Sequence, residues 1–146
     1  MKKENKKLLS GLNQLLADYQ IYYQNLRGLH WNVKGKMFFS LHEKYEELYN
    51  EAAEVIDEIA ERILMIGGQP LHTFGDYTKT AKLKEVADVS DGVEGVQHVL
   101  ENSQLLLESF YNVLETAEGD EGTAALMSDL IGSTEKRIWM LKSFLA

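Results

Sequence analysis

The chain has 146 residues, a net charge of −8 and 45% hydrophobic residues, which is typical of one soluble globular domain over residues 1–146. The absence of cysteine excludes disulfides, thiol catalysis and cysteine-ligated clusters, and leaves His, Asp and Glu as the strong metal ligands. The acidic balance disfavours contact with nucleic-acid phosphates, and no apolar run is long enough to span a membrane. We therefore expect a cytoplasmic protein with no membrane partner.

Apolar residues at three- and four-residue spacing predict four long helices. Their expected ranges run from Leu8 to near Trp31, from about Met37 to Ile66, from about Ser90 to Gly119, and from about Asp120 to Ala146. The connection over residues 71–89 is much longer than the others, and a short helix fits between Asp76 and Lys84. One long crossover predicts an all-α, ferritin-like four-helix bundle with a short extra helix between the second and third long helices.

The second predicted helix carries a polar stripe beside its apolar face, made of His42, Glu46, Asp57 and Glu61. The stripe is roughly 29 Å long at the α-helical rise, too long for one metal ion to contact both ends. It is, however, symmetric under reversal, because both the His42/Glu61 pair and the Glu46/Asp57 pair are centred on the same point of the helix. Two copies packed antiparallel across a two-fold axis would therefore bring His42 of one chain against Glu61 of the other.

Imidazole combined with carboxylates suits divalent iron, manganese or zinc, and iron above all where the site is to be redox-active. His30, at the end of the first predicted helix, is the natural additional imidazole. Di-iron bundles commonly carry a Glu-x-x-His motif within one chain, and this sequence has none, so a site shared between chains is favoured. Histidine and glutamate on a polar helix face are also common on plain surfaces, and spacing alone leaves that alternative open.

A second carboxylate stripe on the same helix consists of Glu47, Glu51, Glu54 and Glu58. Like charges at this spacing repel one another, which is usual for a solvated face. The alternative is a surface that attracts cations for storage or mineral growth. The sequence does not separate these two interpretations.

Three segments of the chain are recognisable. They are Leu29-His30-Trp31-Asn32-Val33-Lys34-Gly35, the stretch from Phe38 to Tyr49 (Phe-Phe-Ser-Leu-His-Glu-Lys-Tyr-Glu-Glu-Leu-Tyr), and Asp57-Glu58-Ile59-Ala60-Glu61-Arg62. They closely resemble the Dps family of mini-ferritins, and the resemblance covers nearly the whole chain. It implies a hollow homododecamer built on two-fold dimers, with iron-oxidising centres at the dimer interfaces.

The resemblance also implies roles for individual residues. His30 and His42 resemble the ligands from one subunit, and Asp57 and Glu61 those from its partner. Glu46 stands where family members commonly carry Asp, which implies a ligand of a second, weaker iron. Trp31 matches an aromatic residue that could intercept one-electron oxidants beside the centre, and interface packing is its alternative role.

Two acidic residues, Asp120 and Asp129, match positions along the three-fold pores through which iron enters family members. An intervening position that is often acidic in the family is Ala125 here. The alternatives are helix capping for Asp120 and a solvated surface for Asp129.

The implied reaction is oxidation of ferrous iron, preferably by hydrogen peroxide, followed by storage of ferric mineral, which protects DNA from oxidative damage. Zinc or manganese could replace iron at the centre. Some family members also bind DNA directly through basic tails, and this chain offers a short basic tail over residues 1–7, with Lys2, Lys3, Lys6 and Lys7. Because the body is acidic, we do not favour direct DNA binding, although nucleoid association remains the competing function.

Overall fold

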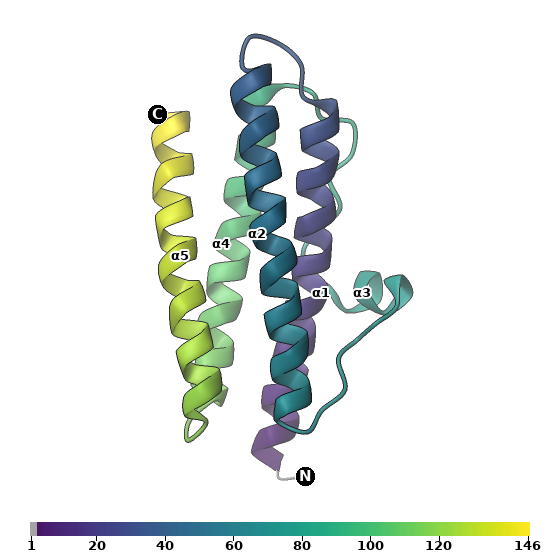
Figure 1. Cartoon of the computed structure of the whole chain (residues 1–146), viewed down its shortest axis with the longest axis vertical. Helices are drawn as coiled ribbons and strands as arrows, with labels where there is room; N and C mark the ends of the chain where they lie inside the picture. The colour runs from purple at the N-terminus through teal and green to yellow at the C-terminus, as the bar shows by residue number, and fades with distance from the viewer. Residues whose placement is uncertain (1–2) are drawn as a thin grey trace.

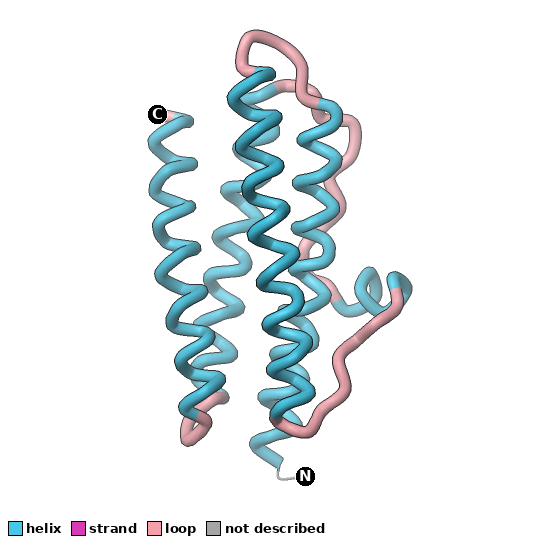
Figure 2. The backbone as a smooth tube through the Cα atoms, viewed as in Figure 1, coloured by secondary structure: helices cyan, strands magenta, loops and turns pink. Residues whose placement is uncertain are grey.

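The computed structural model describes the backbone of residues 3–146 and the side chains of residues 5–146. Four long helices run along one axis: α1 (Lys3–Asn32), α2 (Phe38–Met65), α4 (Gly92–Thr116) and α5 (Glu121–Leu145). A fifth, short helix, α3 (Phe74–Thr80), lies within the long crossover and packs on α1 (Figures 1 and 2). The predicted all-α bundle with a short crossover helix is confirmed.

The chain runs along the bundle axis and turns back at Gly35, whose φ of 109° is in the region that glycine adopts without strain. α1 and α2 are therefore antiparallel neighbours, whereas the crossover makes α4 parallel to α2 (Figure 1). α1 packs against α2 and α4, and α4 packs against α5. α2 and α5 approach each other less closely, which leaves a groove between them that Val55 lines.

The core is built from the apolar faces of all four long helices. The core-facing residues of α2 are mostly buried, but Val55 and Ile56 on α2, and Ile66 just after its end, are only half-buried. Val55 lies at the groove beside α5, where no side chain covers it completely. The largest fully buried side chains are Tyr19, Tyr22, Tyr45, Phe110, Leu12, Leu15, Leu16, Leu26, Ile59, Ile63, Leu106 and Met127.

Several helix boundaries differ from the sequence prediction: the start of α1, both ends of α3, which stops at Thr80 rather than Lys84, and the end of α4, at Thr116 rather than Gly119. α1 starts at Lys3, so residues 3–7 extend the helix and the prediction of a basic tail is wrong for them. Lysine is a good helix former, and the buried residues that follow anchor this first turn. Lys6 and Lys7 are exposed on α1, while Lys2 and the side chain of Lys3 lie outside the described residues.

The crossover helix starts before the predicted Asp76 because Thr73 caps it. The Thr73 side chain accepts a hydrogen bond from the Asp76 N–H at 3.1 Å, and Ala81 returns to extended backbone after the last turn. Within residues 3–146, no helix is long and apolar enough to cross a membrane.

Two buried side chains of α1 hold the crossover in place. Asp18, only 2% exposed, accepts hydrogen bonds from the N–H groups of Lys82 at 2.6 Å and Leu83 at 2.9 Å. Asn25 accepts from the Val86 N–H at 2.9 Å and donates to the Lys84 carbonyl at 3.0 Å. Burial raises the pKa of Asp18 above its ordinary value, although these hydrogen bonds oppose the shift.

We predict that Asp18→Ala lowers the unfolding free energy by about 1–3 kcal/mol, because two N–H groups of the crossover lose their acceptor. Asp18→Asn keeps an acceptor oxygen and removes a buried charge, so it should match the parent protein at pH 7. Thermal melting of the three proteins checks this order. Equal destabilisation by both substitutions would mean that the charge, rather than the acceptor, secures the crossover.

Candidate metal centre

His30 and His42 meet where α1 ends and α2 begins. Their rings are stacked, with centroids 3.8 Å apart and planes 13° apart. His30 Nδ1 lies 2.6 Å from the carbonyl oxygen of His42, and His42 Nδ1 lies 2.8 Å from the carbonyl oxygen of His30. Each residue thus holds the ring of the other.

These two contacts determine the tautomer of each ring. A carbonyl oxygen only accepts hydrogen bonds, so both Nδ1 atoms must carry the proton and donate it. In a neutral imidazole the lone pair then belongs to Nε2, which is the atom left for a metal. Histidines that bind metals commonly donate their second N–H to a carbonyl in this way, so both residues fit a ligand role.

Two aromatic side chains pack against the imidazoles of His30 and His42. Phe38 stacks on His42 with ring centroids 4.9 Å apart, and Tyr49 meets His30 edge-to-face at 5.3 Å. His30 is 6% exposed, whereas His42 is partly open to solvent. No role was predicted for Phe38 or Tyr49 from the sequence. Their spacing from His42 on one helix, at minus four and plus seven, was the available signal.

Glu46 is the carboxylate that the single chain brings to the histidines. Its Oε1 lies 3.7 Å from His30 Nε2, and its side chain is 54% exposed. It therefore lies beside the atom that would hold a metal, with freedom to move.

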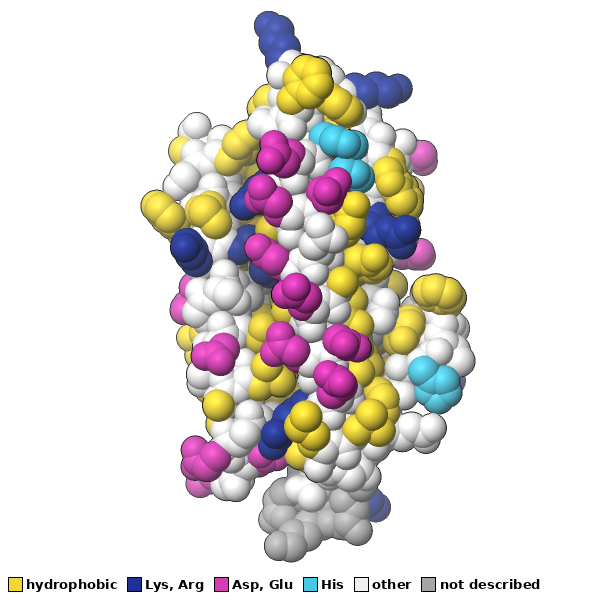
Figure 3. All heavy atoms as spheres, in the orientation of Figure 1, with side chains coloured by type: hydrophobic (Ala, Val, Ile, Leu, Met, Phe, Trp, Pro, Cys, Tyr) yellow, Lys and Arg dark blue, Asp and Glu magenta, His cyan; other side chains and the backbone are white. Residues whose placement is uncertain are grey.

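Asp57 and Glu61 are exposed on α2 and do not join this cluster within the chain. Among the described residues, no three His, Asp or Glu side chains converge closely enough to hold a metal ion. One chain thus supplies two oriented imidazoles at one end of α2 and unpaired carboxylates near its other end. Figure 3 shows carboxylates along the face of α2, with the histidines toward its upper end.

Comparisons with known proteins identify the family. The ferritin-like domain family matches residues 9–146. A DNA protection during starvation protein from Porphyromonas gingivalis is 42% identical over 139 residues, covering 94% of this chain and 87% of that protein. The Dps protein from Vibrio cholerae O1, a member of a broad superfamily of ferritin-like diiron-carboxylate proteins, superimposes with a TM-score of 0.96. It is 47% identical over 98% of this chain and 91% of that one.

The chain belongs to the Dps family of ferritin-like proteins. A Dps structure from Listeria innocua that was soaked with zinc is also similar, with a TM-score of 0.91 and 31% identity over 94% of this chain and 95% of that one. The family resemblance expected from the sequence is confirmed. The ligand roles of individual residues stay predictions.

Trp31 of this Dps chain is 57% exposed on α1, one residue beyond His30. The guanidinium of Arg27 lies 4.9 Å from its ring centroid, a cation–π arrangement that holds the indole against the helix. Interface packing and interception of oxidants by Trp31 both stay predictions.

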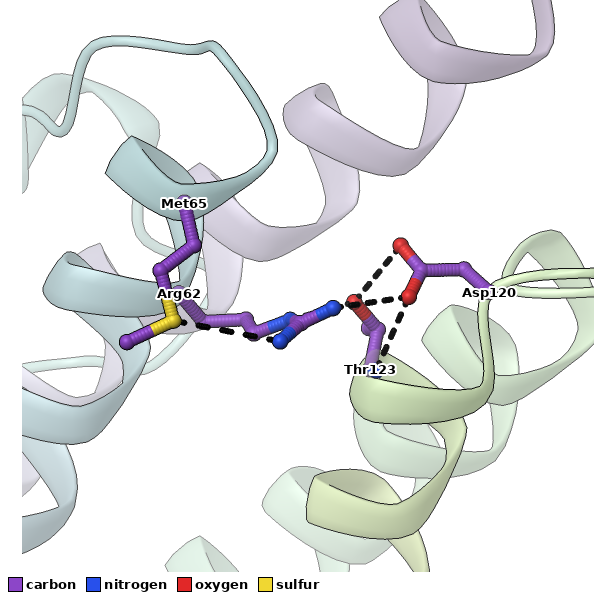
Figure 4. A network of polar contacts seen from close by, with 4 residues as sticks. All are labelled: Arg62, Met65, Asp120 and Thr123. Carbon is purple, nitrogen blue, oxygen red and sulfur yellow. Dashed lines mark hydrogen bonds and ion pairs between the residues drawn. The ribbon is translucent and has the colours of Figure 1, made fainter.

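Asp120 performs the helix-capping role that was the alternative to its place in a pore. It accepts from the Thr123 N–H at 3.1 Å and the Thr123 hydroxyl at 2.9 Å. Arg62 of α2 pairs with it at 2.8 Å, and the same guanidinium bonds Thr123 and reaches Met65 (Figure 4). Asp129 is exposed on α5 and lies apart from this network. A role of Asp120 or Asp129 in an iron-entry pore of the assembled shell stays a prediction.

The Arg62–Asp120 contact is the main link between α2 and the start of α5. Partial burial would raise the pKa of Asp120, but hydrogen bonds from Thr123 and the Arg62 guanidinium outweigh it and hold the pKa below 3.8. The contact of Arg62 with Asp120 was not predicted from the sequence, because the two residues are 58 positions apart.

We predict that Asp120→Asn lowers the unfolding free energy at pH 7 by up to about 1 kcal/mol, because asparagine still caps the helix but lacks the charge that pairs with Arg62. A carboxyl group whose pKa is lowered on folding stabilises the fold at pH values above its pKa in the unfolded chain. This contribution is lost as the pH falls through its pKa in the folded protein. The difference from the parent should therefore shrink as the pH falls below the ordinary carboxyl pKa, and vanish once the pH is below the lowered pKa of Asp120 in the folded protein. Urea unfolding at pH 7 and in acid checks this.

The matched control is Asp91→Asn. Asp91 caps α4 in the same way, accepting from the Glu94 N–H at 2.9 Å, but has no basic partner among the described residues. The Asp91→Asn substitution should lower the unfolding free energy less than Asp120→Asn does at pH 7. Equal effects of the two substitutions would contradict the assignment of the stabilisation to Arg62.

Proposed function

We propose that this Dps protein is a ferroxidase and iron store, whose centres form between the subunits of two-fold dimers within a cytoplasmic dodecamer. The observation that carries the proposal is the reciprocal bonding of His30 and His42. It leaves the Nε2 lone pairs of two stacked imidazoles available for a metal, at a position that the carboxylates of the same chain do not complete. A second chain is therefore needed to complete the ligand set.

Exposed apolar residues support the antiparallel dimer. Phe39 is 84% exposed and Leu64 is 58% exposed, and at about 100° per residue both fall within the angular range of the polar stripe. They lie equally far from the helix midpoint on either side, as His42 and Glu61 do. Antiparallel pairing of two α2 helices would therefore place Phe39 of each chain against Leu64 of its partner. It would bury these side chains at both ends of the interface.

In that pairing, His30 and His42 of one subunit face Asp57 and Glu61 of the other. Two nitrogen and two carboxylate ligands suit ferrous iron as substrate, with zinc or manganese as competitors. Glu46 of the first subunit would reach a second, more weakly held iron.

Two ferrous ions held together deliver two electrons to one substrate molecule. Two Fe²⁺, one H₂O₂ and two protons give two Fe³⁺ and two waters, so no hydroxyl radical is released. The ferric product would then be stored as mineral in the shell. This chemistry would protect DNA by removing the reagents of radical formation, as the name of the Porphyromonas gingivalis relative suggests for that protein.

Direct DNA binding is not part of the proposal. The body is acidic, and residues 3–7 lie within α1 rather than in a free basic tail.

We predict that complementary variants restore each other's activity. His30→Ala/His42→Ala and Asp57→Ala/Glu61→Ala should each lose rapid oxidation of ferrous iron by peroxide, measured by stopped-flow absorbance. After unfolding and joint reassembly of equal amounts, about a quarter of the sites should again combine intact histidines with intact carboxylates. Separate reassembly of each variant should restore nothing.

A matched control is Glu101→Ala/Glu108→Ala, which removes two exposed carboxylates from α4 and should oxidise iron like the parent. Parent-like oxidation by Asp57→Ala/Glu61→Ala would refute the ligand assignment. Two inactive variants that stay inactive when mixed would instead place all ligands in one chain.

We also predict a graded effect at Glu46. Glu46→Ala should lower the affinity for the second iron about tenfold, since a metal ligand is lost, while leaving the first iron bound. Glu46→Asp, with the shorter carboxylate, should fall between the alanine variant and the parent. Isothermal titration with a ferrous salt under anaerobic conditions measures both steps, and loss of the first step in Glu46→Ala would contradict this role.

A further inference from the structure

A column of packed rings runs from the imidazoles of the proposed centre to the surface at the start of α2. His42 stacks with His30 and with Phe38, at ring-plane angles of 13° and 19°. Two rings this close to His42 would collide if they shared one of its faces, so His30 and Phe38 cover opposite faces. Phe39 then meets Phe38 edge-to-face, with ring centroids 5.4 Å apart. The column therefore ends at a side chain that is 84% exposed.

The two ends of the column are held differently. At the inner end, Tyr49 packs edge-to-face on His30 at 5.3 Å, and Tyr23 packs on Tyr49 in the same way at 6.0 Å. At the outer end, α2 begins without a capping side chain, because Met37 at the N-cap position makes no side-chain hydrogen bond. The first turn of α2, which starts at Phe38, therefore depends on packing to keep its place.

Phe38 is the residue of this turn that bears on a proposed metal ligand. His42 is partly open to solvent, and its Nδ1 donates to the His30 carbonyl at 2.8 Å. Water that reaches the ring competes for this donor. With Phe38 over one face and His30 over the other, the ring of His42 has no free face toward which to tilt. Phe38 thus keeps the Nε2 lone pair of His42 in one direction without itself touching a metal.

Phe39 connects this clamp to the dimer face of the proposed function. Its ring stands at 75° to that of Phe38, and most of it is open to solvent in the single chain. Exposed side chains change rotamer freely, and burial removes that freedom. Packing of Phe39 against a second subunit would therefore fix the ring that supports Phe38. Pairing of two subunits and the position of the imidazole would then be coupled.

We propose that Phe38 is a positioning residue of the centre, and that Phe39, once buried between subunits, holds Phe38 against His42. The inference rests on the proposed function for the dimer and for the ligand role of His42. It adds that pairing of subunits fixes the nitrogen ligands as well as supplying carboxylates. No covalent or redox step is involved.

The first measurement needs no metal. Solid-state ¹⁵N NMR of metal-free protein labelled at its four histidines separates the two neutral tautomers of each ring, and His42→Gln identifies the signals of His42. In the parent, His42 should be a single Nδ1–H tautomer. Phe38→Leu should give a mixture of both tautomers, because one face of the ring is uncovered. Phe38→Tyr keeps the ring and should restore the single tautomer.

Phe39→Leu tests the link to the dimer face, since leucine stays apolar but has no ring edge to set against Phe38. It should give a smaller fraction of the second tautomer than Phe38→Leu. The matched control is Phe74→Leu. Phe74 is also 84% exposed and packs edge-to-face on Tyr77 at 6.1 Å, and within the described part of the chain it makes no ring contact with the column. It should leave the His42 signals unchanged.

Anaerobic titration with Co²⁺, followed by its visible absorption, measures the effect on the ligands. Imidazole and carboxylate ligands bind Co²⁺ as well as Fe²⁺. Phe38→Leu should weaken Co²⁺ binding about tenfold and alter the absorption bands, as expected when a group that orients a ligand is lost. Phe38→Tyr should bind like the parent. Circular dichroism and gel filtration report whether each variant folds and assembles.

A single His42 tautomer in a folded Phe38→Leu variant overturns the inference, as do parent-like signals from Phe39→Leu or tautomer mixing in Phe74→Leu. The Phe39→Leu result decides the matter if Phe38→Leu does not fold. Tautomer mixing in Phe38→Leu or Phe39→Leu, combined with no Co²⁺ binding by the parent, would refute the proposed centre and leave the positioning of His42 standing. Co²⁺ binding by the parent with no tautomer mixing in either variant would do the reverse.

Discussion

The reciprocal hydrogen bonds between His30 and His42 are the constraint on which the proposed centre depends. They tie the last turn of α1 to the first turn of α2, so the imidazoles cannot turn without breaking main-chain contacts. The same bonds fix both protons on Nδ1 and leave both Nε2 lone pairs available to a metal. One pair of hydrogen bonds thus joins the two helices and also orients the two proposed metal ligands. Glu46 is the carboxylate of the same chain at this corner, and in the proposed centre the further carboxylates come from a second chain.

The helix α2 has three faces with different surroundings. One face packs into the core, the stripe from His42 to Glu61 is the proposed dimer face, and the carboxylates from Glu51 to Glu58 line the groove beside α5. The looser approach of α5 keeps that groove open. Arg62 bridges α2 to α5 at one end only, through Asp120. The bundle therefore remains closed at this end while a polar groove persists along its side.

Much of this organisation could be predicted because helical periodicity is a local property. The phase of α2, and so the separation of His42 from the core, followed from residue spacing alone. The start of α1 at Lys3 could not be predicted, because no capping residue in the sequence marks it. The packing of the residues that follow sets this end of the helix. The Arg62–Asp120 pair and the burial of Arg137 join residues distant in sequence, and only the fold brings such residues together.

Because the faces of α2 have different surroundings, the kind of sequence change that this helix tolerates is restricted. A point substitution alters one face, but an inserted or deleted residue in the middle of the helix rotates everything beyond it by about 100°. Such a shift would turn apolar side chains toward water and separate the two halves of the reversal-symmetric stripe in the same event. Length variation during evolution should consequently concentrate in the crossover and at the chain ends. For the same reason, a peptide grafted onto this protein by engineering should be inserted in the crossover or at a chain end.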